Sequence, residues 1–188
     1  RAGRTASDQL VVRVEGGGHE GWGESVAEAN PYYSSETTET VWHIVSGFLA
    51  PLVIGREFGH PREVFPAMAR VRGHNMAKAG VEMAAWDLYA RQAGQPLSQV
   101  LGGTRPRIAS GVSIGIQDSL DQLMEKVDRE LAAGYQRIKI KIKPGWDVEA
   151  VERVRARFGD IPLMVDANAA YQLADADHLA RLDPYDLM

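Results

Sequence analysis

At 188 residues, with 45% hydrophobic residues and a net charge of -4, the chain has the composition of a globular protein of one or two domains. The charge gives no electrostatic reason to expect nucleic-acid binding, and the lack of cysteine excludes disulfides and thiolate chemistry. No apolar run approaches the roughly 20 residues that a membrane helix needs. We therefore expect a cytoplasmic protein, away from membranes, that acts on a small molecule.

The first half of the chain predicts an antiparallel hairpin followed by helices. Residues 9–25 contain two short strand patterns joined by a run of glycines. Ser34 or Ser35 can cap the first helix, and a second helix spans residues 61–71. Residues 76–92 are apolar around most of a helical circumference, which is typical of a helix in a core.

From Pro106 onward, strands alternate with amphipathic helices. The apolar runs predict strands over residues 108–116, 138–143 and 161–165, and a further strand that begins at 185–188. Asp118 and Asp147 can each cap a helix between these strands. Alternating strands and helices indicate parallel pairing, either in a doubly wound sheet or in a barrel.

Lysines and isoleucines alternate along the strand at residues 138–143. Parallel sheets are covered on both faces or closed into barrels, so we expect this strand to be buried on both faces. Lys139 and Lys141 project to the same side about 7 Å apart. Two cations at that distance disfavour each other's protonation, which favours Lys141 as a base and Lys139 as its electrostatic neighbour. The alternative is a solvated edge strand, and for Lys143, at the strand exit, we expect solvation.

Interior lysines favour the barrel, in which inward residues at the carboxyl ends of the strands share one site. The predicted fold class is therefore α/β. An α+β capping domain over residues 1–105 precedes the first βα units of a modified TIM-type (β/α) barrel over residues 106–188.

Further candidates for this site lie on the neighbouring strands. Asp166 ends the next strand, and Asn168 shares its parity. A carboxylate there suits Mg²⁺, which prefers oxygen ligands, although Asp166 could also cap the following helix. Ser113, on the first strand of the barrel, could contact a substrate or fill space beside small residues.

An ordered set of motifs resembles one known family. The motifs are Lys139-Ile140-Lys141, Pro144-Gly145-Trp146-Asp147, Val165-Asp166-Ala167-Asn168, Gly21-Trp22-Gly23-Glu24 and Leu101-Gly102-Gly103. Together they resemble the muconate-cycloisomerase-like branch of the enolase superfamily. Within it, the closest resemblance is to the group of o-succinylbenzoate synthases and N-succinylamino acid (N-acylamino acid) racemases.

The resemblance implies a metal-dependent lyase or isomerase that removes a proton α to a carboxylate through an enediolate intermediate. Lys141 would be the general base and Lys139 its cationic partner. Asp166 would be one of three carboxylate ligands to Mg²⁺ or another divalent cation such as Mn²⁺. Ser113 and Asn168 would lie near a small carboxylate substrate, and the protein would be a homo-oligomer.

The resemblance also implies that two metal carboxylates and an opposing lysine follow Met188, and that a capping strand and loop precede Arg1. We therefore expect the chain to be part of a longer product. Dehydration to o-succinylbenzoate and racemisation of an N-acylamino acid both stay open. The alternatives are a dipeptide epimerase, a muconate cycloisomerase, or a non-catalytic barrel fragment that needs a partner chain.

Overall fold

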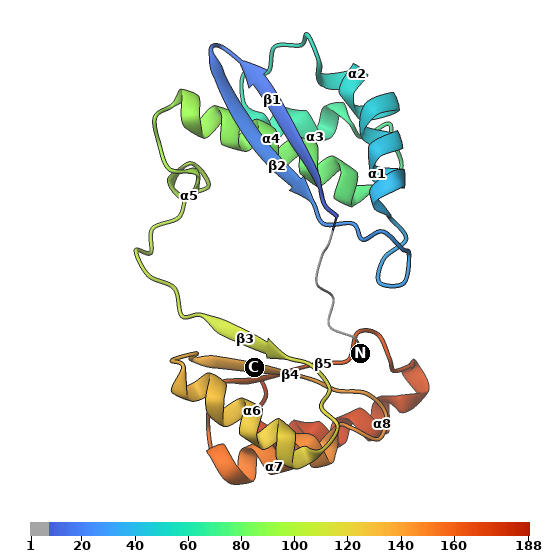
Figure 1. Cartoon of the computed structure of the whole chain (residues 1–188), viewed down its shortest axis with the longest axis vertical. Helices are drawn as coiled ribbons and strands as arrows, with labels where there is room; N and C mark the ends of the chain where they lie inside the picture. Colours follow the sequence, from blue (N-terminus) through green and yellow to red (C-terminus); the bar gives the residue numbers. More distant parts are fainter. Residues whose placement is uncertain (1–7) are drawn as a thin grey trace. The chain divides into compact units, whose positions relative to one another are not determined.

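The computed structural model describes residues 8–188, which divide between Thr104 and Arg105 into two compact units. The first unit contains β1 (Leu10–Gly16), β2 (His19–Ser25), α1 (Thr38–Ile44), the π-helical turn η1 (Val45–Leu49), α2 (Ala50–Val53), the 3₁₀ turn η2 (Pro61–Glu63), α3 (Val64–Ala67), α4 (Asn75–Gln92) and α5 (Leu97–Val100) (Figure 1). The second contains β3 (Gly111–Ile114), α6 (Leu120–Ala132), β4 (Arg137–Lys141), α7 (Val148–Phe158), β5 (Leu163–Asp166), η3 (Leu173–Asp175), α8 (Ala176–Leu179) and η4 (Ala180–Tyr185). None of the helices in this described part is long and apolar enough to cross a membrane.

The first unit is an antiparallel hairpin packed on a long helix. β1 and β2 pair from Leu10 opposite Ser25 to Gly16 opposite His19, as the sequence predicted. β2 lies directly on α4. A Cβ added to Gly21 or Gly23 would collide with backbone atoms of α4, so only glycine allows the strand and the helix to approach this closely.

The first helix, α1, begins at a capping residue that differs from the two predicted from the sequence. Thr37, not Ser34 or Ser35, caps α1: its side chain accepts from Thr40 N–H, and Thr40 Oγ1 accepts from Thr37 N–H. The prediction was wrong because Thr37 is the residue with the extended backbone that enters the helix. Ser34 instead donates to the Glu36 carbonyl.

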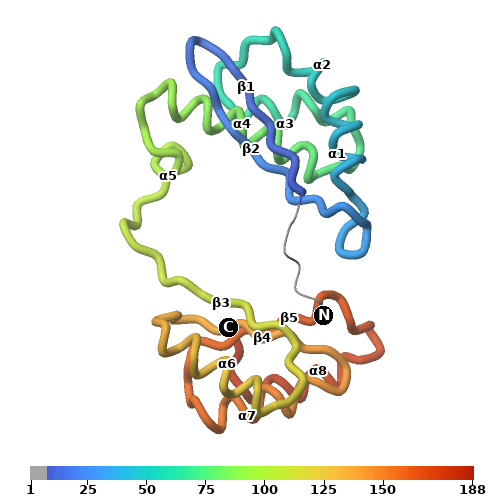
Figure 2. Tube along the Cα trace, in the orientation of Figure 1, coloured from blue at the N-terminus to red at the C-terminus, as the bar shows by residue number. Residues whose placement is uncertain are grey.

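The second unit is a parallel sheet in the order β3-β4-β5. Its helices α6, α7 and α8 lie on one face of the sheet (Figure 1), and the Cα trace in Figure 2 follows the alternation of strand and helix. Ser119 caps α6 by accepting from Gln122 N–H, so the prediction of Asp118 as the cap was wrong by one residue. Asp147 caps α7, as predicted.

Isoleucines of β4 form the centre of the second core. Ile138 and Ile140 are fully buried, and Ile142 follows them into the same cluster with residues of α6 and α7. Beyond β5, Met188 N–H donates to the Leu163 carbonyl at 2.9 Å, so the last residue begins to pair with the free edge of β5. No strand begins at 185–188 as predicted: this one backbone hydrogen bond joins the segment to β5, because a 3₁₀ turn extends to Tyr185.

Candidate active site

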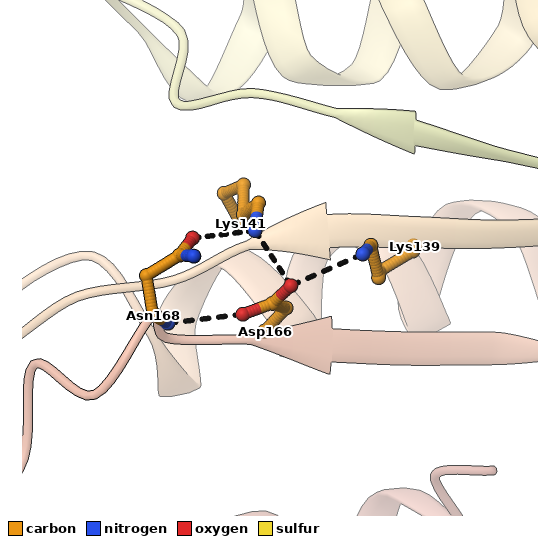
Figure 3. Close-up of polar contacts among 4 residues, drawn as sticks. All are labelled: Lys139, Lys141, Asp166 and Asn168. Atoms are coloured by element: carbon orange, nitrogen blue, oxygen red, sulfur yellow. Dashed lines mark hydrogen bonds and ion pairs between the residues drawn. The ribbon is translucent and has the colours of Figure 1, made fainter. Parts of the chain in front are cut away.

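Four polar side chains meet at the carboxyl ends of β4 and β5. The parallel register pairs Lys141 with Asp166, which are the last residues of the two strands. Lys139 precedes Lys141 on the same side of β4, and Asn168 follows Asp166 as the chain leaves β5. Figure 3 shows the Asp166 carboxylate between the two lysines, with Asn168 beside Lys141. Two neighbouring strands of one unit therefore build this cluster.

The Asp166 carboxylate is the centre of the cluster. Its Oδ2 accepts from Lys141 Nζ at 2.5 Å and from Lys139 Nζ at 3.0 Å. Its Oδ1 accepts from the backbone N–H of Asn168 at 2.9 Å, and Lys141 Nζ also donates to Asn168 Oδ1. The hydrogen bond from Lys141, followed by those from Asn168 and Lys139, holds the pKa of Asp166 well below its usual value. The carboxylate is therefore charged across the physiological pH range.

The lysine face of β4 is open. The side chains of Lys139, Lys141 and Asp166 are 32%, 25% and 29% exposed, whereas the isoleucines between the lysines are buried. The prediction that this strand is buried on both faces is wrong within residues 8–188, because the three-stranded sheet carries its helices on the other face only (Figure 1). A small solute can therefore reach the two ammonium groups.

Asp166 supplies a counter-charge to the two lysines. From the sequence, Lys139 and Lys141 are expected to repel each other as two cations on one strand. In the structure the ionised Asp166 contacts both ammonium groups, so the cluster of three carries one net positive charge. An arrangement of this kind can bind an anion such as a substrate carboxylate, and it can move a proton at Lys141 Nζ.

Ser113 and Lys143 lie outside the bonded cluster. Ser113 on β3 pairs in register with Lys139 and is exposed on the same face of the sheet. Its hydroxyl makes no hydrogen bond to any residue in the described range 8–188. Lys143 is exposed, as predicted, and its backbone closes a tight turn with Trp146.

Sequence reasoning missed two residues near this end of the sheet. Tyr171 and His178 both contact the buried carboxylate of Asp147, at 2.7 Å and 2.8 Å. They lie 24 and 31 positions from Asp147 in the chain, a separation that no local motif covers. One sequence feature could have pointed to these contacts: the predicted cap of α7 is an aspartate, and a capping carboxylate has a second oxygen that can accept from another donor.

Both halves of the chain match known families. Residues 2–102 match the family described as Mandelate racemase / muconate lactonizing enzyme, N-terminal domain. Residues 122–188 match the family described as Enolase C-terminal domain-like. The chain belongs to the mandelate racemase/muconate lactonizing enzyme family, within the enolase superfamily. The predicted resemblance and the predicted fold class are thereby confirmed.

Relatives within the enolase superfamily carry two activity names. The o-succinylbenzoate synthase of Geobacillus kaustophilus is 52% identical over 95% of this chain and 48% of its own length. The N-succinylamino acid racemase of Thermus thermophilus is 46% identical over 93% of this chain and 47% of its own length. A crystal structure of an enolase superfamily member from Listeria innocua superposes with a TM-score of 0.91 at 37% identity, covering 96% of this chain and 49% of that one. The chain thus spans about half the length of the relatives it matches.

The cluster offers oxygen donors of the kind that a divalent cation requires. Asp166 contributes a charged carboxylate that lies open to solvent, and such an oxygen is a preferred ligand of Mg²⁺ and Mn²⁺. Among residues 8–188 no group of three or more histidine, cysteine or acidic side chains is placed to hold a metal. The Asp166 carboxylate is thus an oxygen ligand that a divalent cation could use.

Proposed function

We propose that this chain supplies the base and one metal ligand of an enzyme that removes a proton α to a carboxylate through an enediolate intermediate. The reaction would be dehydration to o-succinylbenzoate, racemisation of an N-acylamino acid, or both. The observation that carries the proposal is the contact of Lys139 and Lys141 with one carboxylate at the carboxyl ends of adjacent parallel strands. In βα barrels this end of the sheet holds the active site.

The proton transfer assigns one role to each lysine. Lys141 Nζ, in its neutral form, takes the α-proton of the substrate, and the electron pair of the broken C–H bond moves onto the substrate carboxylate. Lys139 stays protonated and stabilises the added negative charge. Asn168 Oδ1 accepts a hydrogen bond from Lys141 and so fixes the direction of its Nζ. In the dehydration, Lys141 then returns the proton to the departing hydroxyl group, which leaves as water.

Asp166 would hold a divalent cation, with further ligands from the remainder of the full-length barrel. When bound, Mg²⁺ or Mn²⁺ supplies positive charge that stabilises the enediolate oxygens. Cation binding at Asp166 uses the carboxylate that the lysines contact in this structure, so the three groups share one electrostatic centre.

Whether the reaction is dehydration or racemisation depends on whether a second base lies on the substrate face opposite Lys141. Racemisation needs a second base there, whereas dehydration needs Lys141 alone. Relatives at 52% and 46% identity carry the names o-succinylbenzoate synthase and N-succinylamino acid racemase. They support these two reactions over cycloisomerisation, because the chloromuconate cycloisomerase of Pseudomonas putida is 34% identical. We extend the proposal to a small carboxylate substrate, near which Ser113 would lie, and to a homo-oligomer.

The competing proposal is that the 188-residue chain alone is a non-catalytic barrel fragment that needs a partner chain. The single carboxylate at the cluster favours it, since one ligand binds a cation weakly. Titration of the chain with Mg²⁺ tests this reading, and submicromolar binding would contradict it.

The test of the activity uses Lys141→Ala in the full-length protein. The rate of o-succinylbenzoate formation should fall by about 10²- to 10⁴-fold, and so should the exchange of the α-proton of an N-acylamino acid with solvent deuterium. Lys143→Ala is the matched control, because it removes an exposed lysine of the same segment. Substantial exchange by the Lys141→Ala protein would contradict the assignment of the base.

A further inference from the structure

The buried Asp147 joins two loops at the carboxyl end of the sheet. Its Oδ1 accepts from Val148 N–H at 2.6 Å, which caps α7. Its Oδ2 accepts from Tyr171 Oη–H at 2.7 Å and from His178 Nε2–H at 2.8 Å. The rings of Tyr171 and His178 are stacked, with centroids 6.3 Å apart. We call these three residues the Asp147 clamp; it fastens the segment after β5 to the start of α7.

The second oxygen of Asp147 is not needed to cap the helix. Oδ1 alone satisfies the free N–H group of Val148, and Oδ2 is used entirely by the two side chains that arrive after β5. Burial raises the pKa of Asp147, but the hydrogen bonds from Tyr171, His178 and Val148 N–H, together with the electrostatic interaction with His178, outweigh this and lower it on balance. Asp147 is therefore a charged acceptor for both donors, and charge-assisted hydrogen bonds of this kind are strong.

A strained turn lies between the clamp and the lysine cluster. Asn168 and Ala169 both have left-handed backbones, with φ of 47° and 59°. Ala170 N–H donates to the Ala167 carbonyl at 3.0 Å and closes this turn. Asparagine adopts the left-handed region more readily than most residues but alanine does not, so further contacts are needed to hold the turn. This turn directs Asn168 at the cluster: its N–H donates to Asp166 Oδ1, and its side-chain oxygen accepts from Lys141. Tyr171 follows the turn directly and is the first anchored side chain after it.

We infer that the Asp147 clamp is a positioning device that holds the Asn168–Ala169 turn in its left-handed form and so keeps Asn168 on Lys141. The turn is restrained on one side by the hydrogen bond from Asn168 N–H to Asp166 and on the other by the hydrogen bond from Tyr171 to Asp147. Tyr171, His178 and Asp147 act through Asn168 and touch no reacting atom. The catalytic consequence rests on the proposed function, whereas the structural consequence does not.

The structural test measures amide hydrogen exchange in the 188-residue chain by NMR. Tyr171→Phe removes one donor to Asp147 and keeps the ring, so the Asn168 N–H should exchange about tenfold faster and shift its resonance, as expected for one lost hydrogen bond. Tyr135→Phe is the matched control, because Tyr135 also packs against the second core and its hydroxyl bonds to none of residues 8–188. Unchanged exchange at Asn168 in Tyr171→Phe overturns the inference.

The second variant tests the other arm of the clamp. His178→Ala should also speed Asn168 exchange, and His178→Gln, which keeps a side-chain N–H donor, should restore part of the protection. If Tyr171→Phe does not fold, this pair decides alone, since His178 is 39% exposed and its replacement opens no core cavity. Equal Asn168 N–H exchange in the unmodified chain, His178→Ala and His178→Gln overturns the inference.

The kinetic test uses Tyr171→Phe in the full-length protein. Because the clamp orients Lys141 through Asn168, kcat should fall about tenfold while KM stays within about twofold. A rise in KM with unchanged kcat overturns the positioning role. Failure of the proposed function looks different: the unmodified protein then neither forms o-succinylbenzoate nor exchanges the α-proton of an N-acylamino acid, while the effect of Tyr171→Phe on Asn168 amide exchange persists.

Discussion

Each unit of the molecule contains lysine and acidic side chains that make close polar contacts, but their burial and their partners differ. In the first unit Lys78 is 5% exposed; it donates to the Val71 carbonyl, and its Nζ lies 5.6 Å from the centre of the Phe65 ring. Glu36, also buried, accepts from the N–H groups of Met76 and Ala77 at the start of α4. These charges are satisfied by backbone groups that cannot leave.

In the second unit the charged groups satisfy one another. Lys139 and Lys141 donate to Asp166, and all three side chains are about one quarter to one third exposed. The contrast teaches that burial alone does not identify a functional charge. A charge fixed by the backbone stabilises the fold, whereas charges that contact each other on an open face can exchange partners with a substrate or a cation.

The largest effect expected from this contrast is on activity. Asp166→Asn in the full-length protein should lower α-proton exchange by about 10²- to 10³-fold, because it removes the charge shared by both lysines and the proposed cation. The melting temperature should stay near that of the unmodified protein. Asp160→Asn, at an exposed position before β5, is the control for a change of net charge. Full activity of Asp166→Asn would break the comparison.

The next effect is on the stability of the first unit. Lys78→Met leaves the Val71 carbonyl without its donor and should lower the free energy of unfolding by about 1 to 3 kcal/mol. Urea unfolding followed by circular dichroism measures this. Lys126→Met, which removes an exposed partner of Glu130 on α6, should change stability by about 0.5 kcal/mol or less. Equal effects of the two variants would contradict a structural role for Lys78.

A smaller loss is expected at the start of α4. Glu36→Gln keeps the shape of the side chain and removes its charge, so both N–H groups of the helix lose a charged acceptor. We expect about 1 kcal/mol of destabilisation in the same urea experiment. Glu39→Gln, an exposed acid in the first turn of α1, serves as the control. No loss in Glu36→Gln would show that the helix start does not depend on this charge.

The smallest expected effect is on stability at low pH, and it concerns Asp147, the buried acid of the second unit. The lowered pKa of Asp147 means that its stabilisation is present above the ordinary aspartate value of about 3.9 and is lost as pH falls through the folded-state value. The gap in melting temperature between the unmodified chain and Asp147→Asn should therefore narrow from about pH 5 to pH 3. A gap that is constant over this range would contradict the charged form of Asp147.

Much of the second unit could be predicted because its isoleucines alternate with lysines. Parity placed Lys139 and Lys141 on one face, and parallel pairing brings the ends of neighbouring strands together, so the sequence predicted Asp166 at the same end of the sheet as Lys141 but not its contact with the lysines. Their catalytic and metal-binding roles stay predictions. Cap residues were less predictable: several residues before α1 and α6 could serve, and the backbone angle at entry made the choice of Thr37 and Ser119.

The remaining parts of the site depend on tertiary structure. The sequence does not determine that Asn168 and Ala169 both adopt left-handed backbones, because asparagine enters this region fairly readily but alanine rarely does. The clamp at Asp147 requires side chains brought together from separate loops. The charge balance of the cluster also needs coordinates, because the distance from Asp166 to each lysine decides whether the cations repel or are bridged.

The close approach of β2 to α4 has a consequence for how the chain folds. Trp22 N–H donates to Asp87, 65 positions away, and Gly21 and Gly23 meet the same helix with no side chain between the backbones. Such a contact forms only after a long loop has closed, which costs entropy before any packing is gained. The hairpin of residues 10–25 can form early by local pairing. We therefore expect docking of α4 to be the slow step in the first unit.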